Sequence, residues 1–190
     1  FSMHPLKIIN VWGDAGVIVT NDDAVAERCR LLRNHGLRSR DEMEILGYNT
    51  RLDSLQAVVG LRMLPLVPAW VEKRIENAAY YDRAFAKVPG VRIPPRRSEC
   101  RNVHLLYILF AERRDELLAH CLARGIEAKV HYPIPIYRQQ ALKHLGHSMG
   151  DFPVTDRHAL EMITLPLDQY LTTAQLDEVI SVVSTFYEKA

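Results

Sequence analysis

The sequence lacks a charge bias, paired cysteines and a long apolar run. Its formal net charge is only +1, so no excess of basic residues favours nucleic acid or an anionic membrane surface. The three cysteines (Cys29, Cys100 and Cys121) form no CxxC pair, which is typical of a reduced, cytoplasmic protein. No apolar run approaches the roughly 20 residues that span a bilayer. We therefore expect a cytoplasmic protein with neither a nucleic-acid nor a membrane partner.

The chain also lacks an initiator methionine and opens directly on FSMHPLK. Its 190 residues suffice for one domain of ordinary size or for one and a half small ones. Hydrophobic residues make up 48% and charged residues 25%, the usual balance of a globular protein. No signal peptide, internal repeat or low-complexity tract is visible.

The first part of the chain alternates strand-like and helical patterns. Asn21–Asp23 offers N-caps for one helix and Asp53 for the next, and Pro65 and Pro68 then interrupt the helical pattern. The expected elements are a buried strand at 16–20, a helix ending near 36, a polar loop at 37–52, a helix at about 54–64 and a long helix at about 69–87. We interpret residues 65–88 as a linking helix between two domains.

The second part reads as a small α/β or α+β domain over residues 89–190. Its expected elements are strands at 103–110 and 126–132, helices at 114–124 and 153–162, an extended piece at 163–165, and a terminal helix at about 173–188 that opens on a capping box from Thr172 to Gln175. Residues 1–64 contain too few strands to build a sheet alone. They are therefore interpreted as the tail of a larger α/β domain.

Lys7 is the first candidate for chemistry, although a lysine in a loop is most often a solvated surface residue. It follows an extended, apolar segment, which would favour a neutral and nucleophilic amine. Ser2 lies five residues earlier and could bind a phosphate, and Gly13–Gly16 forms a tight turn after it. An amine nucleophile beside a phosphate site suggests an imine with pyridoxal 5'-phosphate (PLP).

Six motifs, in order, make a resemblance specific: FSMHPLK, GDAGVIVTND, LLRNHG, GYNTRLDSLQA, HYPIPIYRQ and GDFPV. Together they resemble the C-terminal half of the DegT/DnrJ/StrS family of fold-type I, PLP-dependent nucleotide-sugar aminotransferases. The resemblance implies the tail of a PLP-transferase large α/β domain (1–64) followed by a small C-terminal domain. It also implies that the chain is a fragment whose N-terminal half is missing.

The resemblance assigns roles residue by residue. Lys7 matches the lysine that holds the cofactor as an internal aldimine and carries the proton between substrate and cofactor. Ser2 matches a serine that hydrogen-bonds the cofactor phosphate. Asn49 matches an asparagine that reaches the phosphate of the neighbouring subunit, so the active site would be shared within a homodimer. His131 and Tyr132 match a segment that lines the sugar-nucleotide side of the site.

The function implied is transfer of an amino group from an amino-acid donor, glutamate in this family, to a keto-sugar nucleotide in amino-sugar or polysaccharide biosynthesis. Two alternatives stay open within the family: a catalytically degenerate regulatory or scaffold relative, and a PLP-dependent sugar dehydratase. Lys7 argues against the dehydratase, in which histidine replaces the lysine. The missing half should supply the carboxylate that pairs with the pyridine nitrogen, so these 190 residues alone are expected to be inactive.

Several of these residues could have a purely structural role instead. Asn49 could be a plain turn residue, and His131 could be a strand-end histidine held by a backbone carbonyl. His104 falls one position before the histidine that family members often carry in this strand, a shift that would turn the side chain to the other face. No metal site is expected, because no carboxylate or cysteine cluster accompanies His144 and His147.

Overall fold

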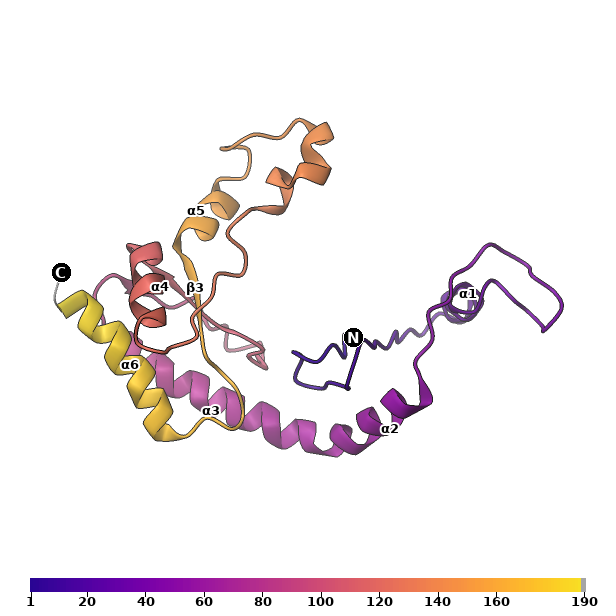
Figure 1. The fold of residues 1–190 in the computed structure, drawn as a ribbon, viewed down its shortest axis with the longest axis horizontal. Helices are drawn as coiled ribbons and strands as arrows, with labels where there is room; N and C mark the ends of the chain where they lie inside the picture. The colour runs from indigo at the N-terminus through magenta and orange to yellow at the C-terminus, as the bar shows by residue number, and fades with distance from the viewer. Residues whose placement is uncertain (189–190) are drawn as a thin grey trace. The chain divides into compact units, whose positions relative to one another are not determined.

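The computed structural model describes residues 1–188 and contains both helix and sheet. The chain divides into two compact units, Phe1–Ala69 and Trp70–Ala190 (Figure 1). The division falls inside the stretch 65–88 that the sequence marks as a linking helix. Each unit is described by itself below.

Unit 1 contains three helical elements: α1 (Asp23–Arg33), α2 (Ser54–Met63) and the 3₁₀ turn η1 (Leu64–Leu66). The predicted N-cap of α1 is confirmed, because the Asp22 carboxylate accepts hydrogen bonds from the backbone N–H groups of Ala24 and Val25 at 2.8 and 3.1 Å. Asp53 does occupy the N-cap position of α2, but its side chain makes no capping hydrogen bond.

The strand expected at 16–20 is wrong for most of its length. Only Gly16 forms a β-bridge, to Ser2, whereas Ile18 and Val19 are 73% and 67% exposed. A strand is stabilised by backbone partners on a neighbouring strand. Among the described residues, the short segment at Phe1 and Ser2 is what pairs with this run, through Val17 N–H to the Phe1 carbonyl at 2.9 Å.

The chain crosses itself tightly where it leaves α1. Gly36 has φ +74°, and a Cβ there would lie 1.7 Å from the Ile45 carbonyl oxygen. A Cβ on Gly47 would lie 2.3 Å from the Gly36 nitrogen. The two backbones can approach this closely only because neither glycine has a side chain. This crossing closes the loop 37–47, which projects beyond α1 in Figure 1.

The helix α3 (Val67–Phe85) continues directly from η1, so the two prolines do not separate two independent helices. Pro65 lies in the 3₁₀ turn and Pro68 in the first turn of α3, where no helical N–H is needed. By length and composition alone, the 32-residue helical stretch Ser54–Phe85 is long and apolar enough to cross a membrane. The expectation that no apolar segment approaches this length is therefore wrong here, although core helices of soluble proteins meet the same criterion.

Unit 2 is built on a three-stranded antiparallel sheet in the order β1-β2-β3. Its strands are β1 (Val91–Arg92), β2 (Tyr107–Ala111) and β3 (Met162–Leu165), and its other elements are α4 (Arg114–Leu122), η2 (Ile136–Arg138), η3 (Gln140–Leu145), α5 (Pro153–Glu161) and α6 (Thr173–Glu188). Figure 1 shows α6 running alongside α3, and the Tyr80 hydroxyl donates to Asp177 between them at 2.6 Å. The capping box is confirmed, because Thr172 N–H donates to Gln175 at 2.9 Å.

The two faces of the sheet have different neighbours. Residues at alternate positions of β2, Tyr107 and Leu109, are fully buried in a core shared with α3, α4 and α6. On the other face, the Phe110 ring packs against His158 of α5, with ring centroids 4.5 Å apart. Thr164 of β3 also belongs to this second face, by the same alternation.

Polar side chains of α3 tie irregular segments to the core of unit 2. The buried Arg74 donates to the carbonyls of His104 and Leu167 at 3.2 and 3.0 Å. Asn77 donates to the Asp168 carbonyl at 2.9 Å, and the Tyr81 hydroxyl to the Pro166 carbonyl at 3.1 Å. These bonds satisfy carbonyl groups that have no sheet partner, which a buried backbone requires.

Asp82 joins α3 to β2 and to the segment before it. It accepts from both nitrogens of Arg96 at 3.0 and 2.9 Å and from the Tyr107 hydroxyl at 2.7 Å. Burial alone would raise the pKa of Asp82, but these hydrogen bonds outweigh it and the pKa lies below its usual value. Burial, together with the positive charge of Arg96, lowers the pKa of the nearby His104.

Two strand expectations in unit 2 need correction. The strand expected at 103–110 begins only at Tyr107, because His104 has φ +50° and its backbone N–H binds the Asn102 side chain. His104 therefore lies before β2 and occupies neither face of that strand. The strand expected at 126–132 is reduced to one bridge, between Lys129 and Thr164.

We predict that Gly36→Ala disrupts the crossing between α1 and the segment at Gly47. The matched control is Gly146→Ala, because Gly146 has φ +73° but open space around its Cβ position. The control should cost about 1–2 kcal/mol for the left-handed backbone alone, whereas Gly36→Ala adds a steric clash with Ile45. Hydrogen exchange of the Tyr48 and Thr50 amides should rise in Gly36→Ala only. Equal protection of these amides in both variants would contradict the prediction.

We also predict that Asp82 stabilises unit 2 in a pH-dependent way. Its folded pKa is depressed, so ionised Asp82 adds stability above the pKa of an unfolded aspartate, roughly 3.9, and this is lost as pH falls through the lower folded value. Asp82→Asn should lower the free energy of unfolding at pH 7 by about 1–3 kcal/mol and flatten its decline in acid. Urea unfolding at several pH values measures both. Asp177→Asn, which changes an exposed aspartate bonded to Tyr80, should have little effect.

Candidate functional site

The segment that carries Lys7 is held against α2 by a small apolar contact. Met3 and Val11 are 6% and 1% exposed and pack with Val59 of α2. The backbone closes around them, since Met3 N–H donates to the Ala15 carbonyl at 2.9 Å and Val11 N–H to the Met3 carbonyl at 3.1 Å. The loop between Met3 and Val11 is therefore fixed at both ends.

Lys7 lies at the end of a hydrogen-bonded turn within that loop. Its backbone N–H donates to the His4 carbonyl at 2.8 Å, and its own carbonyl accepts from the Asn10 side chain at 3.0 Å. Leu6 N–H donates to His4 Nδ1 at 3.1 Å, so His4 organises the same turn. Lys7 is half-buried, and within residues 1–188 no hydrogen bond or ion pair engages its amine. His4 and Asn10 lie three residues on either side of Lys7, and their part in this turn is visible only in the structure.

Ser2 lies on the exposed start of the same segment, bridged to Gly16. Its Oγ accepts a long hydrogen bond of 3.4 Å from the His4 N–H. The hydroxyl hydrogen has no acceptor in the described part of the chain, and a serine hydroxyl in this state can donate to an anion. Ser2 and Lys7 thus lie on one continuous segment of the chain.

Asn49 lies on a different segment, beside the end of α1. Its neighbours pair with that end, because His35 N–H donates to the Tyr48 carbonyl at 2.8 Å and Thr50 N–H to the Arg33 carbonyl at 3.0 Å. Asn34 and Asn49 are the directly opposed pair of this antiparallel bridge. Asn49 is exposed, and in the described residues no hydrogen bond joins it to Ser2 or Lys7. It is more than a plain turn residue, because the bridge fixes its backbone.

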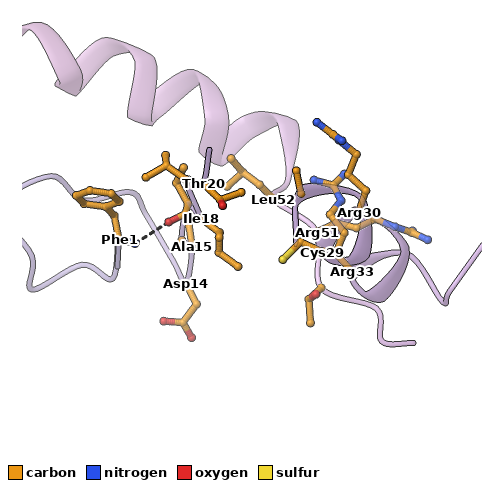
Figure 2. A pocket seen from close by; sticks show the side chains of 15 residues that line it. Phe1, Asp14, Ala15, Ile18, Thr20, Cys29, Arg30, Arg33, Arg51 and Leu52 are labelled. Carbon is orange, nitrogen blue, oxygen red and sulfur yellow. Dashed lines mark hydrogen bonds between the residues drawn. The ribbon is translucent and has the colours of Figure 1, made fainter. Parts of the chain in front are cut away.

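A cavity of about 890 Å³ in unit 1 is not lined by Lys7, Ser2 or Asn49. Its walls come from the run 14–20, from α1 and from residues 50–52, with Arg30, Arg33 and Arg51 on one side (Figure 2). The dashed bond in Figure 2 joins the Phe1 amino group to the Val17 carbonyl at 2.6 Å. Much of the lining is apolar and belongs to the run that lacks strand partners, so the cavity is better explained as a packing surface than as a catalytic cleft.

His131 and Tyr132 belong to unit 2 and are joined by a cis peptide bond. His131 Nδ1 lies 2.9 Å from the Thr164 hydroxyl, on the second face of the sheet. The partner expected for His131, a backbone carbonyl, is therefore replaced by a side-chain hydroxyl. Tyr132 is 74% exposed and lines a cavity of about 570 Å³ together with Ile134, His158 and others.

His144 and His147 have ordinary partners. His144 Nδ1 lies 3.0 Å from the Ala141 carbonyl, and His147 Nδ1 lies 3.4 Å from the Asp151 carboxylate. Within residues 1–188, no group of three histidine, cysteine, aspartate or glutamate side chains is arranged to hold a metal ion.

The residues of unit 1 fit a phosphate-bearing aldehyde such as PLP. Lys7 offers an amine that no acceptor occupies in the described residues, and Ser2 offers a hydroxyl donor on the same loop. Asn49 offers amide donors from an exposed position. Hydrogen-bond donors and an amine are the groups that a phosphate and an aldehyde require.

Comparison with known proteins shows which family the chain resembles. A pleiotropic regulatory protein from Geobacillus stearothermophilus is 35% identical over 98% of this chain and 51% of its own length. A dTDP-3-amino-3,4,6-trideoxy-alpha-D-glucose transaminase from Streptomyces venezuelae is 35% identical over 100% of this chain and 50% of its own. The chain thus spans about half the length of the curated relatives it matches.

Comparison with solved structures agrees with these sequence relatives. The crystal structure of S. venezuelae DesV in complex with a ketimine intermediate matches with a TM-score of 0.96 and 35% identity, covering 100% of this chain and 51% of the other. The model of the DegT/DnrJ/EryC1/StrS aminotransferase family matches residues 1–184. This chain belongs to the DegT/DnrJ/EryC1/StrS aminotransferase family.

Proposed function

We propose that this chain works as the lysine-bearing half of a PLP-dependent aminotransferase that converts a keto-sugar nucleotide to an amino-sugar nucleotide, with glutamate as the amino donor. The observation that carries the proposal is the Lys7 amine, half-buried on a fixed turn and unpaired in the described residues, in a chain of this family. The named relatives that act on dTDP-linked and UDP-linked sugars support the substrate class.

Each residue has a definite task in this proposal. Lys7 Nζ attaches the cofactor covalently and, once released, moves the proton of the substrate. The Ser2 hydroxyl donates to the cofactor phosphate, and Asn49 donates to the phosphate bound by the neighbouring subunit. His131 and Tyr132 line the side where the sugar nucleotide enters. When bound, PLP supplies the electron sink that acidifies the donor's Cα–H.

The assembly is part of the proposal. The site is shared in a homodimer, and the rest of the full-length protein supplies the carboxylate for the pyridine nitrogen, so residues 1–190 alone do not catalyse. A cytoplasmic location suits a nucleotide-sugar substrate, and the product would feed amino-sugar or polysaccharide synthesis. Turnover by the 190 residues alone would contradict this.

A regulatory protein is the second candidate, because the relative from G. stearothermophilus carries a regulatory name. A relative that had lost its chemistry is expected to lose at least one of Lys7, Ser2 and Asn49, and all three are present here. Lys7 likewise argues against a sugar dehydratase, which replaces this lysine by histidine. The aminotransferase is therefore the better supported proposal.

Lys7→Ala in the full-length protein should abolish covalent cofactor attachment. With PLP added, the wild type should show a visible absorption band that glutamate bleaches, and borohydride reduction should leave a cofactor mass on the Lys7 peptide. Lys87→Ala, which removes an exposed lysine, should behave as the wild type does. Identical spectra and peptide masses for Lys7→Ala and wild type would reduce Lys7 to an ordinary loop lysine.

Mixing two inactive variants tests the shared site. Lys7→Ala and Asn49→Ala dimers, each impaired alone, should regain about a quarter of the wild-type sites after subunit exchange, since half of the dimers are then mixed and each has one intact site. Activity of the mixture, compared with that of each variant alone, is the measurement. No recovery despite demonstrated exchange would place Asn49 and Lys7 of one subunit in the same site.

A further inference from the structure

Asn34 lies opposite Asn49 and has no role in the proposed function. Asn34 and Asn49 form a bridge of the non-hydrogen-bonded kind, because the bonds flank them at His35–Tyr48 and Thr50–Arg33. Directly opposed residues of such a pair have Cα atoms about 4.5 Å apart and side chains on one face. Two carboxamides in these positions are close enough to bind each other.

Arg51 takes the acceptor of this pair by engaging the side-chain oxygen of Asn34. Its Nε and one terminal nitrogen both donate to Asn34 Oδ1, at 3.0 and 2.7 Å. Arg51 follows Asn49 by two residues and so shares its face, at the diagonal position that long side chains reach. A carboxamide oxygen has two lone pairs, and the two Arg51 donors occupy both.

We propose that Arg51 is a positioning residue that keeps the Asn49 amide donors available for the phosphate by occupying the oxygen of Asn34. With Oδ1 of Asn34 taken, the Asn49 amide has no competing acceptor at its nearest neighbour and is left to an external one. The Asn34 amide nitrogen takes no part in these two bonds and can only donate. This inference rests on the proposed role of Asn49.

The hydrogen-bonding role of Arg51 can be distinguished from an effect of its positive charge alone. Arg33 lines the same cavity wall as Arg51 in Figure 2, and no hydrogen bond or ion pair involves its side chain in residues 1–188. Lysine at position 51 would keep the charge but offers a point donor instead of a planar fork. Substitutions at positions 33 and 51 can therefore change the positive charge and the hydrogen bonds to Asn34 Oδ1 independently.

The test is a double-mutant cycle on PLP affinity in the full-length protein, measured by equilibrium titration of PLP absorbance in a Lys7→Ala background so that covalent attachment does not contribute. Arg51→Ala frees the Asn34 oxygen and should weaken PLP binding about tenfold, the loss of roughly one good hydrogen bond. Asn34→Ala removes the competing acceptor, so the Arg51→Ala/Asn34→Ala pair should bind close to the parent. Arg51→Lys should remain weakened and Arg33→Ala should not be.

The outcomes are distinguishable. If Arg51→Ala weakens binding equally with and without Asn34, Arg51 acts on the ligand directly and the inference is wrong, while the proposed function stands. If Asn49→Ala leaves PLP affinity unchanged, the role of Asn49 and the inference fail together. Side-chain amide NMR of the cofactor-free protein gives a second readout: the Asn49 NH₂ protons should shift in Arg51→Ala and return in the double variant, provided that the backbone amide spectrum shows the bridge intact.

Discussion

The close approach of Gly36 and Gly47 is the contact on which the polar site of unit 1 depends. Without a side chain at either position, the chain can fold back on the end of α1 and align Asn49 with Asn34. This alignment in turn places Arg51 within reach of Asn34 Oδ1. The backbone bridge thus determines which carboxamides are neighbours, and the side-chain bonds decide which donors remain for a ligand. The absence of side chains at Gly36 and Gly47 therefore allows Asn49 and Arg51 to lie next to Asn34.

In unit 2 the constraint is the small sheet, in which β1 has only two residues. A sheet of this size leaves many carbonyls without ladder partners. Side chains on the buried face of α3 take their place: Arg74, Asn77 and Tyr81 donate to carbonyls before and after the strands. The cost of burying a guanidinium is met by its several acceptors, although burial lowers the pKa of Arg74. The segment that leads to His131 and Tyr132 is attached separately to β3, through Thr164.

Helix starts could be predicted from local sequence more completely than strands, although the extended piece expected at 163–165 lies within β3. Asp22 and the Thr172–Gln175 box mark helix starts because the capping bond is formed within three residues. The run Gly16–Thr20 has a strand pattern, but whether it pairs depends on a partner far away in the sequence. The candidates Ser2 and Lys7 could be proposed from their motif. The roles of His4, Asn10 and Arg51 depend on a turn and a bridge that spacing alone does not specify, so they emerged only from the structure.

The exposed apolar surface of unit 1 bears on how the site is completed. Leu55, Val58 and Leu61 recur every third residue of α2 and are 65%, 62% and 70% exposed. Burying each such side chain is worth about 1.5–3 kcal/mol, so further protein that covers this stripe would stabilise α2. The opposite side of α2, at Val59 and Gly60, is the support of the Lys7 loop. Assembly and the geometry of Lys7 are therefore coupled through one helix: what stabilises α2 from outside also fixes the turn that presents the amine.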